Sequence, residues 1–170
     1  MTDDGRRITA AANAKRRSRH RHTTTVASRQ GRVSALVAGY SKRSLVAKLG
    51  IKAGTTLAIL NPPRGYERTL GRLPQTAIRR WRAAGSLDVI QFFATGKREL
   101  ERSFSRLKRA LAPAGALWIS WPKQASRVPT DLTEDVIRAI GLAHGLVDVK
   151  VCAVDDVWSG LKLVRRLKDR

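Results

Sequence analysis

The clearest pattern in this chain is an alternation between short apolar runs and helices with one apolar face. Three runs are almost continuously apolar, as strands buried on both faces are: Thr55–Leu60, Leu87–Phe93 and Ala116–Trp121. Leucine and phenylalanine recur at helical spacing within Lys97–Ala112, which predicts an amphipathic helix between the second and third runs. Strands that alternate with helices predict an α/β fold with a mostly parallel sheet.

Three further helices are predicted, at Ser44–Leu49, Tyr66–Leu70 and Asp131–Ala143. Thr95 lies where it can cap the start of the long helix. Asp131 and Glu134 have the spacing of a capping box, which predicts that the last helix begins at Asp131.

Two short connections limit the topology. Val147–Val154 and Leu161–Leu167 read as strands, and their connection is too short for a parallel crossover, so they predict a C-terminal antiparallel hairpin. Ala77–Trp81 is extended and weakly apolar, and Arg82–Ser86 is too short to contain a crossover helix. Ala77–Trp81 is therefore an antiparallel edge strand, a loop, or a reduced remnant of a strand–helix unit.

The chain of 170 residues carries a net charge of +21, which favours anionic partners. Residues 1–37 are rich in Arg, Ser, Thr and Ala without an apolar face, so we expect a disordered basic tail before a folded domain at 38–170. The basic run Lys15–His22 makes this tail a candidate nucleic-acid-binding arm. An organelle transit peptide is a second interpretation. An artefact of the start site is a third, because a GTG codon for Val37 can serve as a bacterial start.

No run of eighteen apolar residues is present, and nothing near Met1 has the layout of a secretory signal. We therefore expect a cytoplasmic protein without membrane contact. The one cysteine, Cys152, lies in an apolar run and is expected to be a small buried residue. No Cys/His spacing indicates a metal site.

Several motifs resemble the class I methyltransferases that use S-adenosylmethionine. The resemblance lies in the Leu49–Gly54 segment before the first strand, in Leu87–Ile90, and in the helix, turn and strand of Leu107–Ser120. The C-terminal hairpin fits as well. The resemblance implies a reduced Rossmann-like fold, in which ligands bind beyond the carboxyl ends of the parallel strands.

Residues 37–170 also resemble a bacterial domain family of unknown function, number 3052. The segments that carry this second resemblance are Ala38–Ser41, Leu60–Tyr66, Trp118–Lys123, Pro129–Asp135 and Val157–Lys162. This resemblance implies the fold and no particular reaction.

Two features depart from the methyltransferase pattern. The first strand runs into Asn61–Tyr66, where Pro62 and Pro63 remove two N–H donors and the freedom that a glycine-rich turn would supply. Around Ala77–Trp81 there are arginines and no carboxylate to accept hydrogen bonds from ribose hydroxyls. We therefore expect no cofactor, with S-adenosylmethionine as the alternative.

The expected function is a non-catalytic or accessory module that binds an anionic small molecule or a protein. The alternatives are a divergent S-adenosylmethionine-dependent methyltransferase and a charge-driven nucleic-acid-binding protein. In the ligand site, cations would neutralise an anion and aromatic side chains would form apolar walls. The residues of this expected site are Asn61, Arg64, Gly65, Tyr66, Lys97, Trp121, Lys123, Trp158 and Ser159.

Overall fold

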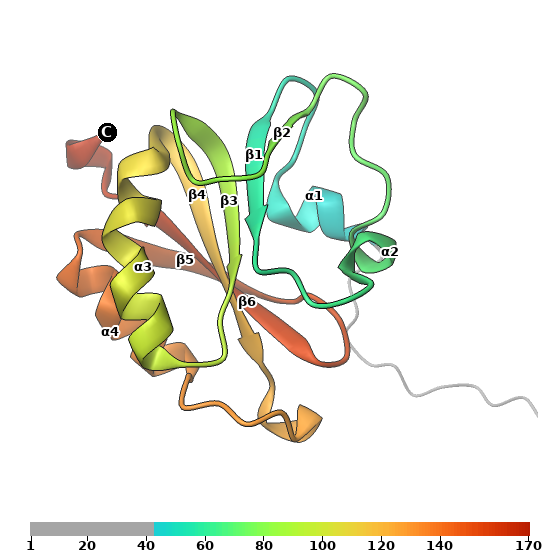
Figure 1. The fold of residues 1–170 in the computed structure, drawn as a ribbon. Helices are drawn as coiled ribbons and strands as arrows, with labels where there is room; N and C mark the ends of the chain where they lie inside the picture. Colours follow the sequence, from blue (N-terminus) through green and yellow to red (C-terminus); the bar gives the residue numbers. More distant parts are fainter. Residues whose placement is uncertain (1–42) are drawn as a thin grey trace, which may run out of the picture. The chain divides into compact units, whose positions relative to one another are not determined.

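The structure is a computed structural model that describes residues 43–170; the expected tail and the alternative start at Val37 lie outside the described residues. In the described part, six strands form one sheet in the order β2-β1-β3-β4-β6-β5 (Figure 1). The strands are β1 Thr56–Leu60, β2 Ile78–Arg80, β3 Leu87–Phe93, β4 Leu111–Pro122, β5 Leu146–Ala153 and β6 Trp158–Arg165. The first four strands pair in parallel, and β6 is antiparallel to both β4 and β5. The expected α/β fold with a C-terminal antiparallel hairpin is confirmed.

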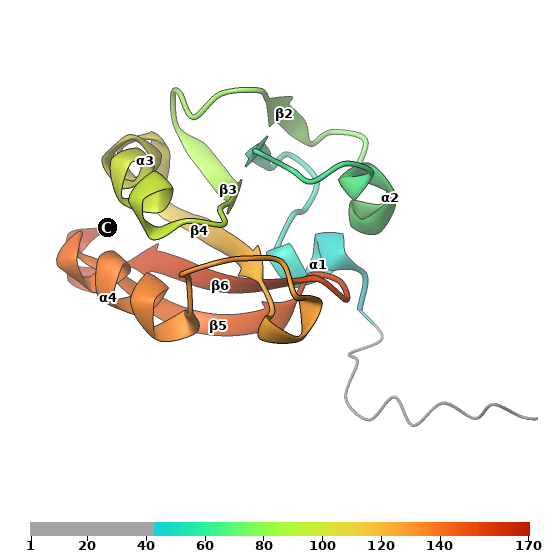
Figure 2. The ribbon, with the colours of Figure 1, turned by 60° about the horizontal axis from the view of Figure 1, so that its bottom comes forward.

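Helices cover both faces of the sheet, as Figures 1 and 2 show from two directions. The helices are α1 Leu45–Leu49, α2 Tyr66–Leu70, α3 Lys97–Ala110 and α4 Glu134–Ala143. Successive side chains of a strand point to opposite faces, so Leu57 and Ile59 pack with α1 and α2 while Ala58 packs with α3 and α4. The sheet is therefore the middle of three layers.

The segment whose direction the sequence left open contains a short parallel strand. In the register of β1 and β2, Thr56 lies opposite Ile78 and Ala58 opposite Arg80. The chain then returns to the start of β3 through Trp81–Ser86, without a helix. Of the three expectations for this segment, the structure therefore agrees with the reduced remnant of a strand–helix unit. The return is feasible because six extended residues span about 20 Å, which is enough to cross a single strand.

The start of α3 is capped from a distant segment, and the expectation for Thr95 is wrong. Gly96 occupies the N-cap position and makes no side-chain cap. The Asp131 carboxylate instead accepts a hydrogen bond of 2.6 Å from the backbone N–H of Lys97. Asp131 therefore caps α3 and not the helix that follows it in sequence.

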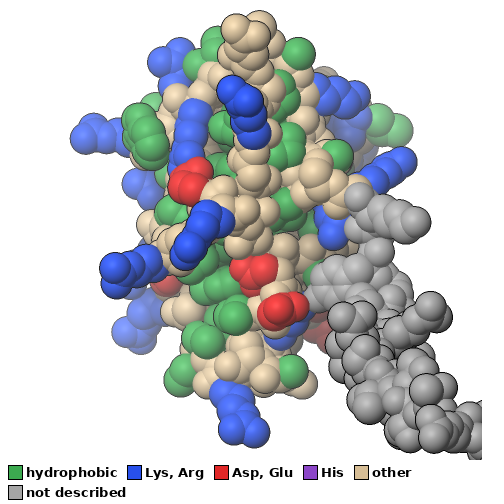
Figure 3. Space-filling model, turned by 90° about the vertical axis from the view of Figure 1, so that its right-hand side faces the viewer, with side chains coloured by type: hydrophobic (Ala, Val, Ile, Leu, Met, Phe, Trp, Pro, Cys, Tyr) green, Lys and Arg blue, Asp and Glu red, His purple; other side chains and the backbone are tan. Residues whose placement is uncertain are grey.

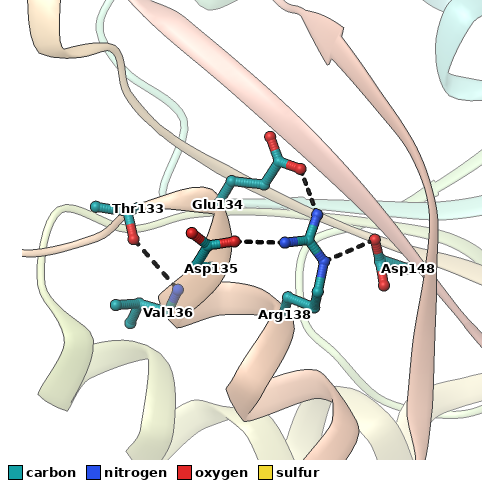
Figure 4. A network of polar contacts seen from close by, with 6 residues as sticks. All are labelled: Thr133, Glu134, Asp135, Val136, Arg138 and Asp148. Carbon is teal, nitrogen blue, oxygen red and sulfur yellow. Dashed lines mark hydrogen bonds and ion pairs between the residues drawn. The ribbon is translucent and has the colours of Figure 1, made fainter.

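The last helix accordingly begins at Glu134 and not at Asp131. Its cap is Thr133, whose hydroxyl accepts a hydrogen bond from the backbone N–H three residues further on (Figure 4). Arg138 then contacts Glu134 and Asp135 on the same helix and Asp148 on β5, so one guanidinium links α4 to the edge of the sheet. The Asp148 and Glu134 carboxylates raise the pKa of Arg138, chiefly through the hydrogen bond to Asp148.

Two strands begin well before their predicted starts for local reasons. β4 begins at Leu111, five residues earlier than expected, because the predicted turn around Gly115 lies within an irregular part of the strand. β6 begins at Trp158, earlier than predicted, because the Asp155 carboxylate accepts 2.8 Å hydrogen bonds from the N–H groups of Val157 and Trp158. This tight turn leaves more of the chain for pairing.

Candidate functional site

The carboxyl ends of β1 and β3 open onto two adjacent hollows. The first, called here the aromatic hollow, has a volume of about 180 Å³ and is lined by Asn61, Phe93, Ala94, Thr95, Glu99 and Trp158. The second, called the loop hollow, has a volume of about 470 Å³ and is lined by Leu60, Asn61, Trp81, Arg82, Ala83, Ala84 and Arg106. Asn61 lines both hollows. It follows β1 directly, at the edge where parallel sheets bind ligands.

The turn after β1 has left-handed backbone at both of its ends. Asn61 has φ +52° and Gly65 has φ +80°. Asparagine tolerates this conformation better than most residues, and glycine adopts it freely. The two prolines between them still lack N–H donors, as the sequence indicated. The turn therefore bends sharply despite the prolines, because Asn61 and Gly65 supply the freedom that the prolines lack.

The aromatic hollow combines a carboxylate with two aromatic rings. The Asn61 Nδ2 donates a 3.0 Å hydrogen bond to Glu99 Oε1, which fixes the position of both side chains. Phe93 and Trp158 meet edge to face, with 5.1 Å between their ring centres. A carboxylate beside aromatic rings attracts a small cation, through charge and through the ring quadrupoles.

Beneath α2, a buried row of hydrogen bonds crosses from the helix into the sheet. The Tyr66 hydroxyl donates to Gln91 Oε1 at 2.5 Å, and Gln91 Nε2 donates to the Ser120 hydroxyl at 3.0 Å. Tyr66 is only 2% exposed, and this burial raises the pKa of Tyr66 well above its usual range. Tyr66 therefore lies within the core and not on an open wall.

The remaining residues of the expected site are dispersed. Trp121 is 7% exposed and packs with α3 and α4, while Ser159 pairs opposite it in the sheet. The Lys123 ammonium donates to a backbone carbonyl of the hairpin turn, and Lys97 forms an ion pair within α3. Arg64 is exposed. Asn61 and Trp158, two of the nine expected residues, both line the aromatic hollow.

Trp81 is a site residue that the sequence reasoning missed. Its side chain is 76% exposed, and it lies directly after β2, where it lines the loop hollow. The Arg79 guanidinium lies 4.6 Å from the centre of the indole ring and is held by two hydrogen bonds to Glu67, of 2.7 and 2.9 Å. Trp81 lies at the ligand-binding edge because β2 pairs in parallel with β1, and this pairing has no signal in the local sequence.

The sulfur and metal chemistry of the described part is limited. Cys152 is half-buried, and burial raises the pKa of its thiol. Within residues 43–170, no three His, Cys, Asp or Glu side chains lie close enough together to hold a metal ion.

No helix of this range is both long and apolar enough to cross a bilayer. Figure 3 shows a face on which basic side chains project at many points and acidic ones are few.

No family model matches the chain, and no curated protein matches its sequence. Among solved structures, a SAM-dependent methyltransferase from Aquifex aeolicus is similar with a TM-score of 0.51 and 15% identity, over 70% of this chain and 86% of that one. A complex of DhpI with SAH is similar with a TM-score of 0.51 and 13% identity, over 73% of this chain and 83% of that one. These likenesses show that residues of this chain form a methyltransferase-like Rossmann fold.

The expectation of no cofactor is contradicted by this comparison, because the similar DhpI structure contains SAH. The physical premise behind the expectation is also incomplete. Glycine is not the sole source of freedom in this turn, because Asn61 also adopts a positive φ. The aromatic hollow fits the charge of an adenosyl cofactor, since a sulfonium cation suits the Glu99 carboxylate and the rings of Phe93 and Trp158.

Proposed function

We propose that the domain is a divergent methyltransferase that binds S-adenosylmethionine at the carboxyl edge of β1 and β3. The observation that carries the proposal is Asn61. Asn61 follows β1 directly and has a left-handed backbone conformation, and it lines both hollows at that edge. The proposal thus rests on the site as well as on the fold, which by itself would not define an activity.

Three residues would hold the positive end of the cofactor. Glu99 supplies a negative charge, while Phe93 and Trp158 supply aromatic surface around it. When bound, the cofactor supplies an electrophilic methyl group. The absence of a side chain at Gly65 lets the Arg68 guanidinium pack against the turn, since a Cβ there would lie 3.2 Å from it.

The ribose end of the cofactor requires a different partner from the usual acid. Arg80 ends β2, and a guanidinium has no acceptor for a hydroxyl. Asn61 offers such an acceptor. Its Nδ2 donates a hydrogen bond to Glu99, while its Oδ1 accepts no hydrogen bond from the described residues. We assign the ribose contact to Asn61 Oδ1 for this reason. We also propose membership of the bacterial domain family 3052, supported by the segments that resemble it.

Calorimetric titration of the full chain with S-adenosylmethionine and S-adenosylhomocysteine tests the proposal. We expect saturable binding of both, weakened about tenfold by Asn61→Gly, which keeps the backbone conformation and removes the amide. Asn61→Ala removes the amide and also strains the backbone by about 1–2 kcal/mol, so it should bind more weakly still. Gln75→Ala, an exposed amide outside both hollows, is the matched control.

Absence of binding by the folded wild-type chain would refute the methyltransferase proposal. Binding without methyl transfer to any offered acceptor would instead support the accessory, non-catalytic module. Equal affinity of the wild type and Asn61→Gly would contradict only the assignment of the ribose contact to Asn61, and not the binding of the cofactor.

A further inference from the structure

The outer face of α3 carries a row of four arginines. Arg98, Arg102, Arg106 and Arg109 are spaced by four, four and three residues, so they lie on one side of the helix. All four are exposed. The row extends over about 16 Å along the helix axis. None of these side chains forms an ion pair or hydrogen bond with another described residue.

This row is unfavourable for the helix on its own. Like charges at i,i+4 destabilise a helix by a few tenths of a kcal/mol per pair. The acids of α3 do not offset it, because Glu99 contacts Asn61 and Glu101 contacts Lys97. The repulsion between the four arginines in the free protein would be offset when a polyanion binds along the row.

The row continues onto the loop after β2. Arg106 lines the loop hollow together with Trp81 and Arg82. Arg80 and Arg82 in turn line a further hollow of about 590 Å³, again with Trp81. The exposed Trp81 therefore shares each of the two hollows with arginines.

Trp81 is positioned as a stacking surface. Arg79 lies over its ring and is itself fixed by Glu67, so the indole is held from within the protein. Most of the ring remains accessible, since the side chain is 76% exposed. A large exposed aromatic side chain that is held in place is suited to stack on a flat ligand.

We propose that these residues form a binding surface for single-stranded nucleic acid. Arginines contact successive phosphates, and an unpaired base stacks on Trp81. A single strand is favoured because its bases are free to stack, whereas those of a duplex are not. The surface comprises Arg80, Trp81, Arg82, Arg98, Arg102, Arg106 and Arg109. It differs from the expected basic tail, and it is tested without any cofactor.

Fluorescence anisotropy with labelled oligo(U) and oligo(dT), on the full chain over a range of salt concentrations, tests this surface. The variant Arg102→Gln/Arg106→Gln/Arg109→Gln should lower the slope of log affinity against log salt by about 2, at about 0.7 per lost phosphate contact. The matched control removes three exposed charges elsewhere: Lys52→Gln/Arg72→Gln/Arg127→Gln. It should leave the slope nearly unchanged.

Trp81→Ala should weaken binding about 5- to 150-fold, the usual effect of losing one base stack, while Trp81→Phe should retain most of the affinity. Thermal unfolding of each variant checks that it is folded. Equal losses from the two triple variants would overturn the proposal, because bulk charge or the tail would then explain binding. Unchanged affinity in folded Trp81→Ala, or equal affinity for a duplex of the same length, would overturn it as well. A preference between the two oligomers would distinguish RNA from DNA.

Discussion

The Tyr66 hydroxyl on α2 lies 2.5 Å from Gln91 Oε1 on β3, and both side chains are buried. This hydrogen bond joins a five-residue helix to the centre of the sheet. It also fixes the end of the turn that begins at Asn61.

Tyr66→Phe should destabilise the protein by about 1–3 kcal/mol, because it leaves the buried Gln91 oxygen without a donor. Urea unfolding followed by circular dichroism measures this. The variant Tyr66→Phe/Gln91→Leu/Ser120→Ala removes the whole row of polar groups and should recover part of the loss. A single variant as stable as the wild type would show that the hydrogen bond is not needed.

Stability should fall at high pH in a way that depends on Tyr66. Burial, aided by nearby negative groups, raises the pKa of Tyr66 above its usual value. Above about pH 10 the unfolded chain loses this proton while the folded chain keeps it, so the contribution of Tyr66 is complete below pH 10. It is lost as the pH rises towards the folded-state pKa, at up to about 1.4 kcal/mol per pH unit. Unfolding midpoints between pH 9 and 11 should decline more steeply in the wild type than in Tyr66→Phe.

Asp131→Ala should destabilise the protein by about 0.5–2 kcal/mol, the usual cost of losing a helix cap. Asp131 serves as the cap of α3 although it lies 34 positions away in sequence. Asp131→Asn keeps an oxygen acceptor and should lose less, whereas Thr95→Ala should be nearly neutral. Thermal unfolding of the three variants compares them. The reverse order would restore Thr95 as the cap.

Gly115→Ala should be strongly destabilising, by about 1–3 kcal/mol or more. A Cβ at this position would lie 2.8 Å from the Leu87 carbonyl oxygen and 2.9 Å from the Leu111 side chain. The carbonyl belongs to the backbone of β3 and cannot move without disturbing the sheet. Gly96→Ala, where a Cβ meets nothing within 4 Å, is the control, and both are compared by urea unfolding. Similar stabilities of the two variants would contradict this close packing.

Glu99→Gln should weaken the binding of S-adenosylmethionine about 2- to 5-fold, the range of a partly exposed ion pair. The affinity for S-adenosylhomocysteine, which lacks the sulfonium charge, should change less. Calorimetric titration of both ligands gives the ratio. A parallel loss for both would mean that Glu99 acts through the position of Asn61, to which it is hydrogen-bonded, and not through its charge.

Much of the fold could be predicted because local patterns determined it. The apolar run at Leu87–Phe93 and the helical turn at Tyr66–Leu70 have the predicted bounds. The short connection before β6 required an antiparallel hairpin, which the structure confirms. In each case the signal lies within the segment itself or in the length of the chain next to it.

The candidate site depended more on contacts between distant segments. Topology alone predicts which residues lie near the carboxyl edge, but not which of them are exposed to solvent. Tyr66 and Trp121 are buried by packing from other elements. Trp81 was missed because the direction of β2 is set by pairing with β1, which no local pattern records.

The sequence by itself determined the alternation of strands and helices and the excess of positive charge, because both depend on residues that are close together in the chain. The tertiary structure decided the conformation of Asn61, the remote cap from Asp131 and the exposure of Trp81. These features depend on which surfaces meet when the chain closes, and the free energy of those contacts outweighs local preference.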